Sequence, residues 1–296
     1  MKFQWIFALM IVIASSSYGI LATIVKLAMK AGFTSAEAIT SQYVFGFALM
    51  LILVIFTQRS LPKLNKAGVV TLVLAGSFTA CTGIVYGQAL NYLPASLAVV
   101  MLFQFTWIGL LMDCLIKKRL PSRIEVISLL FLFAGTILSA GILNVDLSQI
   151  AWQGWVLGFI AACSFAAFLQ INSRPVEGIT PIARTFVLSI VALLIISFVL
   201  TPEIIWNGQI FNGLWKYGLA LGFFGIVLPI MLFSLAAPKV GGALVSILSA
   251  MELPVAIIVS VLVLGEILTY LQMVGIVLVL IGMTLPPYFS SKKSTA

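Results

Sequence analysis

Glu252 is the side chain with the clearest chemical potential in this sequence. It lies 11 residues after Gly241 and 12 before Leu264 within one apolar stretch, which is about 17 Å along a helix from either end. At that depth in a bilayer a carboxylate is costly unless it meets water, a cation or hydrogen-bond donors. Such a group can exchange a proton or hold a cationic ligand. It can equally bond neighbouring helices and unwound backbone beside Pro254, and both interpretations stay open.

Other polar and aromatic residues also occur in apolar stretches, where lipid would not stabilise them. Each one alone more often joins helices than binds a ligand. Together they offer aromatic faces for an ammonium group and a carboxylate opposite, a combination that suits a zwitterion or a cation. The candidate substrate-binding or coupling residues are Glu252, Tyr18, Tyr86, Gln104, Trp107, Gln42 and Ser164.

Two prolines, Pro229 and Pro254, fall inside apolar stretches, where each removes a backbone hydrogen bond. They predict helix kinks that could act as hinges, although kinked helices also occur in rigid bundles. Asp113 precedes Lys117 by four residues, which is the spacing of a local ion pair on a helix.

Several chemistries are excluded by the residues that the chain lacks. It contains no histidine, which removes Ser-His-Asp hydrolysis and imidazole-based metal or proton chemistry. It also has no GxxxxGK[ST] motif for ATP. The cysteines Cys81, Cys114 and Cys163 are scattered and are interpreted as packing residues. We therefore expect no enzyme, no catalytic or metal site, and no cofactor.

The elements that position these residues are membrane helices. Hydrophobic residues make up 62% of the chain, charged residues 8%, and the mean hydropathy is +1.22, which excludes a soluble domain. The apolar stretches are long enough to cross a bilayer as helices and too uniformly apolar for barrel strands. The sequence predicts an all-α membrane protein of ten transmembrane helices, at 6–27, 36–57, 67–89, 95–116, 123–143, 152–172, 181–201, 214–236, 242–264 and 269–289.

The ten helices form two similar sets of five. A constant offset of 147 positions aligns Trp152 with Trp5, Ala236 with Ala89, and Gly282 with Gly135. One register through both ends and the middle of the unit indicates an internal repeat. We predict one repeat at 1–147 and a second at 148–296, an organisation typical of transporters.

Lysine and arginine are distributed very unequally between the two sides of this arrangement. One side carries Lys2, Arg59, Lys63, Lys66, Lys117, Lys118, Arg119, Arg123, Arg174, Arg184, Lys239, Lys292 and Lys293, and the other Lys26, Lys30 and Lys216. The split of 13 against 3 predicts that the rich side and both termini are cytoplasmic. Because each set has an odd number of spans, the repeats are inverted. These basic residues lie in short loops and meet lipid headgroups, so they indicate no nucleic acid.

The stretch from Leu248 to Pro254 and the later Leu264-Gly265-Glu266 resemble the EamA family of the drug/metabolite transporter superfamily, and Gln272, Gly275 and Gly282 extend the similarity. The resemblance covers the whole chain. It implies a bacterial inner-membrane secondary transporter, generally an exporter of amino acids or other small metabolites, with a central cavity between its halves. In the first repeat, Phe105, Trp107 and Arg119 stand in place of Glu252, Pro254 and Glu266, so acidic coupling rests on the second repeat.

Three functional hypotheses follow. The favoured one is an exporter of amino acids or related metabolites that works by alternating access, either proton-coupled or facilitative. The alternative is a multidrug-type exporter of lipophilic cations. A membrane enzyme or lipid-handling protein is the third hypothesis, and it would need a catalytic cluster that the sequence does not offer. Because one chain contains both repeats, a monomer could suffice, and a homodimer is also compatible with the sequence.

Overall fold

The computed structural model describes residues 2–58, 65–89, 91–93, 95–139, 150–200, 203–265 and 267–293. All regular secondary structure in these residues is helical. Nine stretches of them are long and apolar enough to cross a membrane. The described part of a further apolar helix, Arg123–Ser139, has 17 residues. The all-helical, multi-pass membrane class predicted from the sequence is therefore confirmed, while the boundary between the repeats at 147 lies outside the described residues.

The first half of the chain closely follows the predicted spans. Its helices are α1 (Lys2–Lys30), α2 (Ser35–Thr57), α3 (Lys66–Ala89), α4 (Ala95–Leu102), α5 (Phe105–Ile116) and α6 (Arg123–Ser139). The predicted continuous span 95–116 is wrong in one respect, because a turn at Phe103 and Gln104 divides it into α4 and α5. There the Gln104 side chain donates a hydrogen bond to the carbonyl of Val100, 3.0 Å away, which competes with regular backbone bonding.

The second half follows the same order of elements with more irregular turns. It contains α7 (Trp152–Asn172), α8 (Pro181–Leu200), η3 (Glu203–Ile205), η4 (Ile210–Leu214), α9 (Trp215–Gly222), η5 (Phe223–Val227), α10 (Leu228–Val240), α11 (Gly242–Leu248), η6 (Ser249–Met251), α12 (Glu252–Leu264) and α13 (Tyr270–Lys293). The π-helical η5 and the 3-10 turn η6 interrupt two of the predicted spans.

Each of these two interruptions ends shortly before a proline. Pro229 follows η5 and Pro254 follows η6. A proline has no amide proton, so the carbonyls four residues earlier, at Gly225 and Ala250, lose their helical donors. The helix adjusts its turn at such a place. Whether either turn moves as a hinge stays a prediction.

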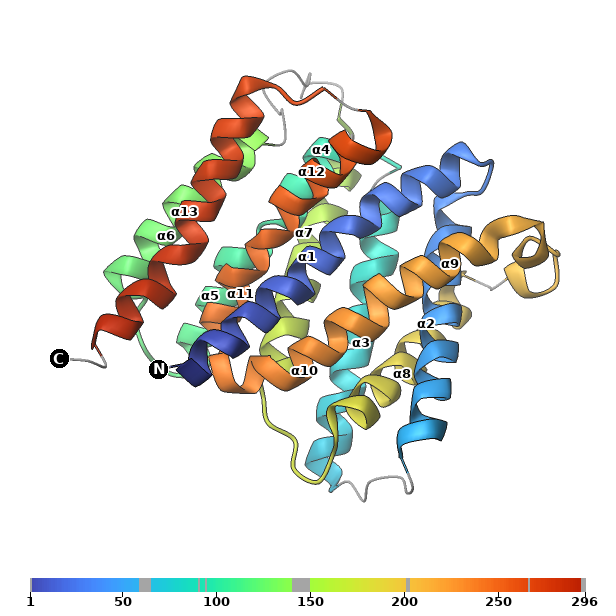
Figure 1. Cartoon of the computed structure of the whole chain (residues 1–296), viewed down its shortest axis with the longest axis horizontal. Coiled ribbons are helices and arrows are strands. Elements are labelled where there is room, and N and C mark those ends of the chain that lie inside the picture. Colours follow the sequence, from blue (N-terminus) through green and yellow to red (C-terminus); the bar gives the residue numbers. More distant parts are fainter. Residues whose placement is uncertain are drawn as a thin grey trace.

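Helix contacts recur in corresponding pairs along the chain. α1 packs against α10 and α12, and α7 likewise packs against α3 and against α4 and α5. The turn at 103–104 between α4 and α5 has its counterpart 147 positions later, at 250–251 in η6. Figure 1 shows α6 and α13 side by side at one edge, and α1 beginning on the same side of the bundle where α13 ends.

An aromatic cluster occupies the interior of the bundle. Phe105 of α5 lies edge-on to Phe165 of α7, with ring centroids 4.8 Å apart. Phe168 packs against Phe165 and against Phe233 of α10, at 6.0 and 6.3 Å. Because lipid and protein interior are similarly apolar, such packing contacts, rather than hydrophobic burial, hold membrane helices together. The cluster joins elements from both halves of the chain.

Candidate functional site

Glu252 is the first residue of α12, directly after the irregular turn η6. Its Oε2 atom is buried and has no hydrogen-bond partner. α1 crosses the helix at very short range here, since a Cβ atom on Gly19 would lie 2.5 Å from the Glu252 carbonyl oxygen. Only glycine fits such an approach. The unpaired carboxyl oxygen of Glu252 costs about 1–3 kcal/mol, which a bound proton or ligand would offset.

Two predicted tyrosines accompany this carboxyl group. Tyr18 of α1 and Tyr86 of α3 both lie close enough to Glu252 for their side chains to interact electrostatically. The ring of Tyr18 also packs against Phe165 and Phe233, with centroids 5.8 and 5.9 Å apart. We call Tyr18, Tyr86 and Glu252 the central group. It combines one acidic group, two hydroxyl donors and aromatic faces, which can recognise an ammonium group.

Two other predicted residues lie at helix contacts. The Ser164 hydroxyl donates to the carbonyl of Phe78 on α3 at 2.9 Å, so it joins two helices. Gln42 lies against η5, where a Cβ on Gly225 would come within 2.5 Å of the Gln42 amide nitrogen. The contact of Ser164 matches the general expectation that an isolated polar residue in a membrane bundle serves packing.

Gln104 and Trp107 bind each other. The Trp107 indole nitrogen donates to the Gln104 amide oxygen at 2.7 Å. Gln104 also lines a pocket of about 180 Å³ between α4, α5 and α6, together with Val100, Phe133 and Thr136. No member of the central group lines that pocket. The predicted set is thus divided between the central group, two helix contacts and this pair.

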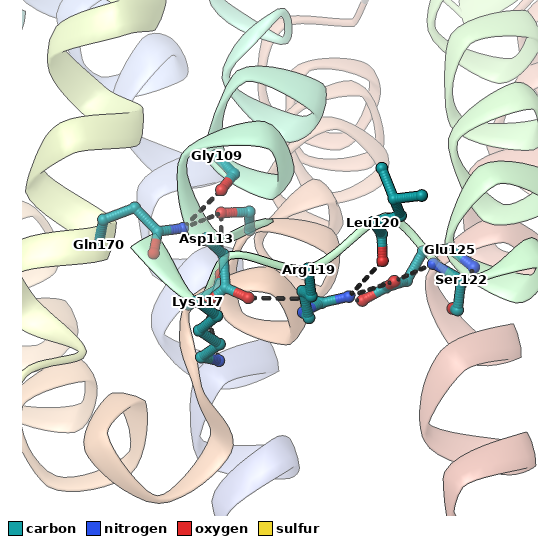
Figure 2. Close-up of polar contacts among 10 residues, drawn as sticks. Gly109, Asp113, Lys117, Arg119, Leu120, Ser122, Glu125 and Gln170 are labelled. Carbon is teal, nitrogen blue, oxygen red and sulfur yellow. Dashed lines mark hydrogen bonds and ion pairs between the residues drawn. The ribbon is translucent and has the colours of Figure 1, made fainter. Parts of the chain in front are cut away.

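A second polar group lies where α5 ends and α6 begins (Figure 2). The predicted pair between Asp113 and Lys117 is confirmed, at 2.8 Å. Arg119 adds a bond to Asp113 at 2.9 Å and a two-pronged contact with Glu125, both prongs at 2.8 Å. The carboxylate of Glu125 accepts hydrogen bonds from Arg119 and so raises the pKa of its guanidinium above the ordinary value. Arg119 therefore remains charged and connects the two helices.

This ion cluster borders a pocket of about 290 Å³. Its charged lining is Lys117, Arg119 and Glu125, and Gly241 lies at the junction of α10 and α11 on its other side. Apolar residues from α11 and α13 complete the walls. Within the cluster, Asp113 and Glu125 face Lys117 and Arg119.

The ion pair between Arg119 and Glu125 was not predicted, although the sequence contains one signal for the position of Glu125. Ser122 and Glu125 have the spacing of a capping box, and the Ser122 amide donates to Glu125 at 2.7 Å. The predicted family landmark Glu266 lies outside the described residues. Within the described part of the chain, no cluster of three or more His, Cys, Asp or Glu could hold a metal ion.

Comparison with known proteins assigns the fold to a family. The EamA-like transporter family matches the chain twice, at residues 5–141 and 152–285. A solved structure titled "Crystal structure of protein" covers 99% of both chains with a TM-score of 0.75 at 12% sequence identity, which shows a shared fold. No curated protein matches the sequence. With most of its length covered by the two matches, this chain belongs to the EamA-like transporter family.

Proposed function

We propose that this protein exports amino acids or related small metabolites across the inner membrane by alternating access, with Glu252 as its coupling or substrate-binding group. The observation that carries the proposal is the buried, unpartnered Glu252 oxygen beside Tyr18 and Tyr86 in an apolar bundle. Members of the family are transporters, which supports a non-enzymatic role.

The proposal includes ten spanning helices arranged as two inverted repeats, 1–147 and 148–296. The double family match and the corresponding helix contacts support the repeat. The 13 to 3 distribution of basic residues supports cytoplasmic termini. In Figure 1 the start of α1 and the end of α13 lie on the same side of the bundle, which agrees with this orientation. One chain would contain the whole pathway, so a monomer suffices. Lipid headgroups would bind the basic loops.

The chemistry of the central group favours a zwitterion over a lipophilic cation. Glu252 and the aromatic rings suit an ammonium group, and the hydroxyls of Tyr18 and Tyr86 can donate to a carboxylate. A lipophilic cation would leave those donors unused, and multidrug export is therefore the second candidate. At the position related to Glu252 by the repeat, Phe105 is fully buried in the aromatic cluster. Proton coupling would thus depend on one carboxyl group.

A thermal-shift screen of the purified protein tests this proposal. Amino acids, polyamines and quaternary ammonium compounds are added at two pH values to the wild type and to Glu252→Gln. We expect an amino acid or a related amine to raise the Tm of the wild type by an amount that depends on pH. In Glu252→Gln the stabilisation should be weaker and independent of pH, because the amide does not titrate.

Glu177→Gln is the matched control, since Glu177 is exposed in the connection between α7 and α8. It should respond to ligands as the wild type does. Stabilisation that persists in Glu252→Gln with the same pH dependence would reduce Glu252 to a structural residue. Stabilisation by quaternary ammonium compounds alone would favour the multidrug alternative.

A further inference from the structure

Gln170 of α7 is buried at the point where α5 meets α11. Its amide nitrogen donates to the carbonyl of Gly109 on α5 at 2.7 Å and lies 3.5 Å from the Ser246 hydroxyl on α11. Ser246 itself donates to the carbonyl of Gly242, one turn earlier, at 3.0 Å. Figure 2 shows the Gln170 side chain reaching Gly109. One buried amide of α7 thus bonds α5 and lies against α11.

The three helices could not approach this closely with larger residues. A Cβ atom on Gly109 would collide with the Ser246 hydroxyl, and one on Gly242 would collide with the Gln170 amide oxygen. Gln170 is 6% exposed and Ser246 is fully buried. A hydrogen bond in such a buried site is electrostatically stronger than one in water.

The contact between the two interrupted helices lies at one end only. α5 packs against α11, whereas the other halves, α4 and α12, share no comparable contact within the described residues. The α5–α11 end carries the ion cluster and the α10–α11 junction, which the proposed orientation places on the cytoplasmic side. The two interrupted spans, α4–α5 and α11–α12, therefore pack together toward the proposed cytoplasmic side and lie apart toward the other side.

The repeat offers no equivalent of this hydrogen bond at the opposite end. Moving each residue by 147 positions identifies the counterparts of Gln170, Gly109, Gly242 and Ser246 as Thr23, Ala256, Ala95 and Val99. None has an amide side chain, and three are apolar. Contact between α4 and α12 would therefore rest on apolar packing, without an amide side chain such as that of Gln170 between the two helices.

We propose that Gln170 is an inner latch, which holds α5 against α11 and keeps the cytoplasmic end closed in the absence of substrate. Opening that end removes the contacts of the Gln170 amide with Ser246 and Gly242 of α11, so the resting protein favours the state that is open to the outside. This inference rests on the proposed alternating access and orientation. It adds a gating residue that lies apart from the central group.

The chain contains its own reporter for this opening. Cys114 is 5% exposed and packs with Leu110 of α5 and Ala243 of α11, so it becomes accessible when the two helices separate. Replacing the other cysteines, Cys81→Ala and Cys163→Ala, leaves Cys114 as the single thiol. The rate at which a water-soluble maleimide labels it then measures the open fraction.

We expect Gln170→Leu to increase the labelling rate of Cys114 about threefold to twentyfold, the range that corresponds to one interhelical hydrogen bond in a membrane protein. Gly242→Ala should also increase it, because the added methyl group displaces the Gln170 amide. Gln88→Leu makes the same substitution at an exposed position of α3 and should leave the rate unchanged.

An unchanged rate in Gln170→Leu, at a Tm equal to that of the wild type, would overturn the latch. If Gln170→Leu does not fold, two other variants test the latch. These are Gly242→Ala and Gln170→Asn, whose shorter side chain cannot span the same distance. Labelling needs no substrate, so it is independent of the thermal-shift screen. Faster labelling of Cys114 in Gln170→Leu, with no ligand found in the thermal-shift screen, would support the latch and contradict the proposed substrates. An unchanged labelling rate, with a stabilising amino acid found in the screen, would support the substrates and contradict the latch.

Discussion

Replacing Gly275 by leucine should force α6 and α13 apart and lower the free energy of unfolding by about 2 kcal/mol. A Cβ atom on Gly275 would lie 2.5 Å from the amide nitrogen of Ser139 and 2.6 Å from the carbonyl oxygen of Gly135. Both are backbone atoms, which cannot rotate away. Overpacking lowers the free energy of unfolding by about 1–3 kcal/mol, and contacts with backbone atoms place this site at the upper end. The higher helix propensity of leucine than of glycine offsets about 1 kcal/mol of that loss.

Gly135 on α6 is equally restricted, since a Cβ atom there would lie 2.7 Å from the carbonyl oxygen of Gly275. The Ser128 hydroxyl also donates to the carbonyl of Gly282 at 2.6 Å. Small residues and backbone hydrogen bonds thus determine how closely the pair packs. Unfolding in mixed micelles measures the loss, with Thr284→Leu as control because Thr284 is exposed on the same helix. Equal stabilities of the two variants would contradict this account.

The helices were predictable from sequence because lipid leaves the backbone few alternatives. Every amide in the bilayer must find its partner within the segment, so long apolar stretches become helices. The same argument fails at Phe103 and Gln104, where hydropathy is unbroken and a side-chain hydrogen bond accompanies the turn. In the second half Pro254 lies close to the corresponding turn, at 250–251, so the sequence indicated that interruption but not the one at Phe103 and Gln104.

The candidate site was predictable only in part, because depth in the membrane does not specify a partner. Tyr18 and Tyr86 lie within electrostatic range of Glu252, and their role in one site stays a prediction. Trp107 had the right depth and residue type, yet its indole bonds Gln104 three residues earlier. Contacts between distant segments, such as Gln170 with Gly109, depend on how helices rotate and cross, which periodicity in a uniformly apolar helix does not encode.

Local contacts were easier to predict than tertiary ones. The pair of Asp113 and Lys117 follows from helical spacing alone. Arg119 follows the end of α5, where residue spacing gives no geometry, so its role required the folded structure. That role is large enough to measure.

We expect Arg119→Met to lower the free energy of unfolding by about 3 kcal/mol. Arg119 makes three hydrogen bonds to Asp113 and Glu125, and bonds to charged groups contribute about 1.5–3 kcal/mol each. The full sum is not expected, because the Arg119 side chain is 33% exposed and water replaces part of the loss. Lys117 also remains as a partner for Asp113, whose side chain is only 4% exposed.

Arg123→Met is the matched control, since Arg123 is exposed at the start of α6 and its loss should change stability by less than about 0.5 kcal/mol. Arg119→Lys should fall between the two, because an ammonium group keeps the charge but cannot form the two-pronged contact with Glu125. A double-mutant cycle with Glu125→Gln isolates that contact. A coupling energy near zero would mean that the contact between Arg119 and Glu125 does not stabilise the junction of α5 and α6.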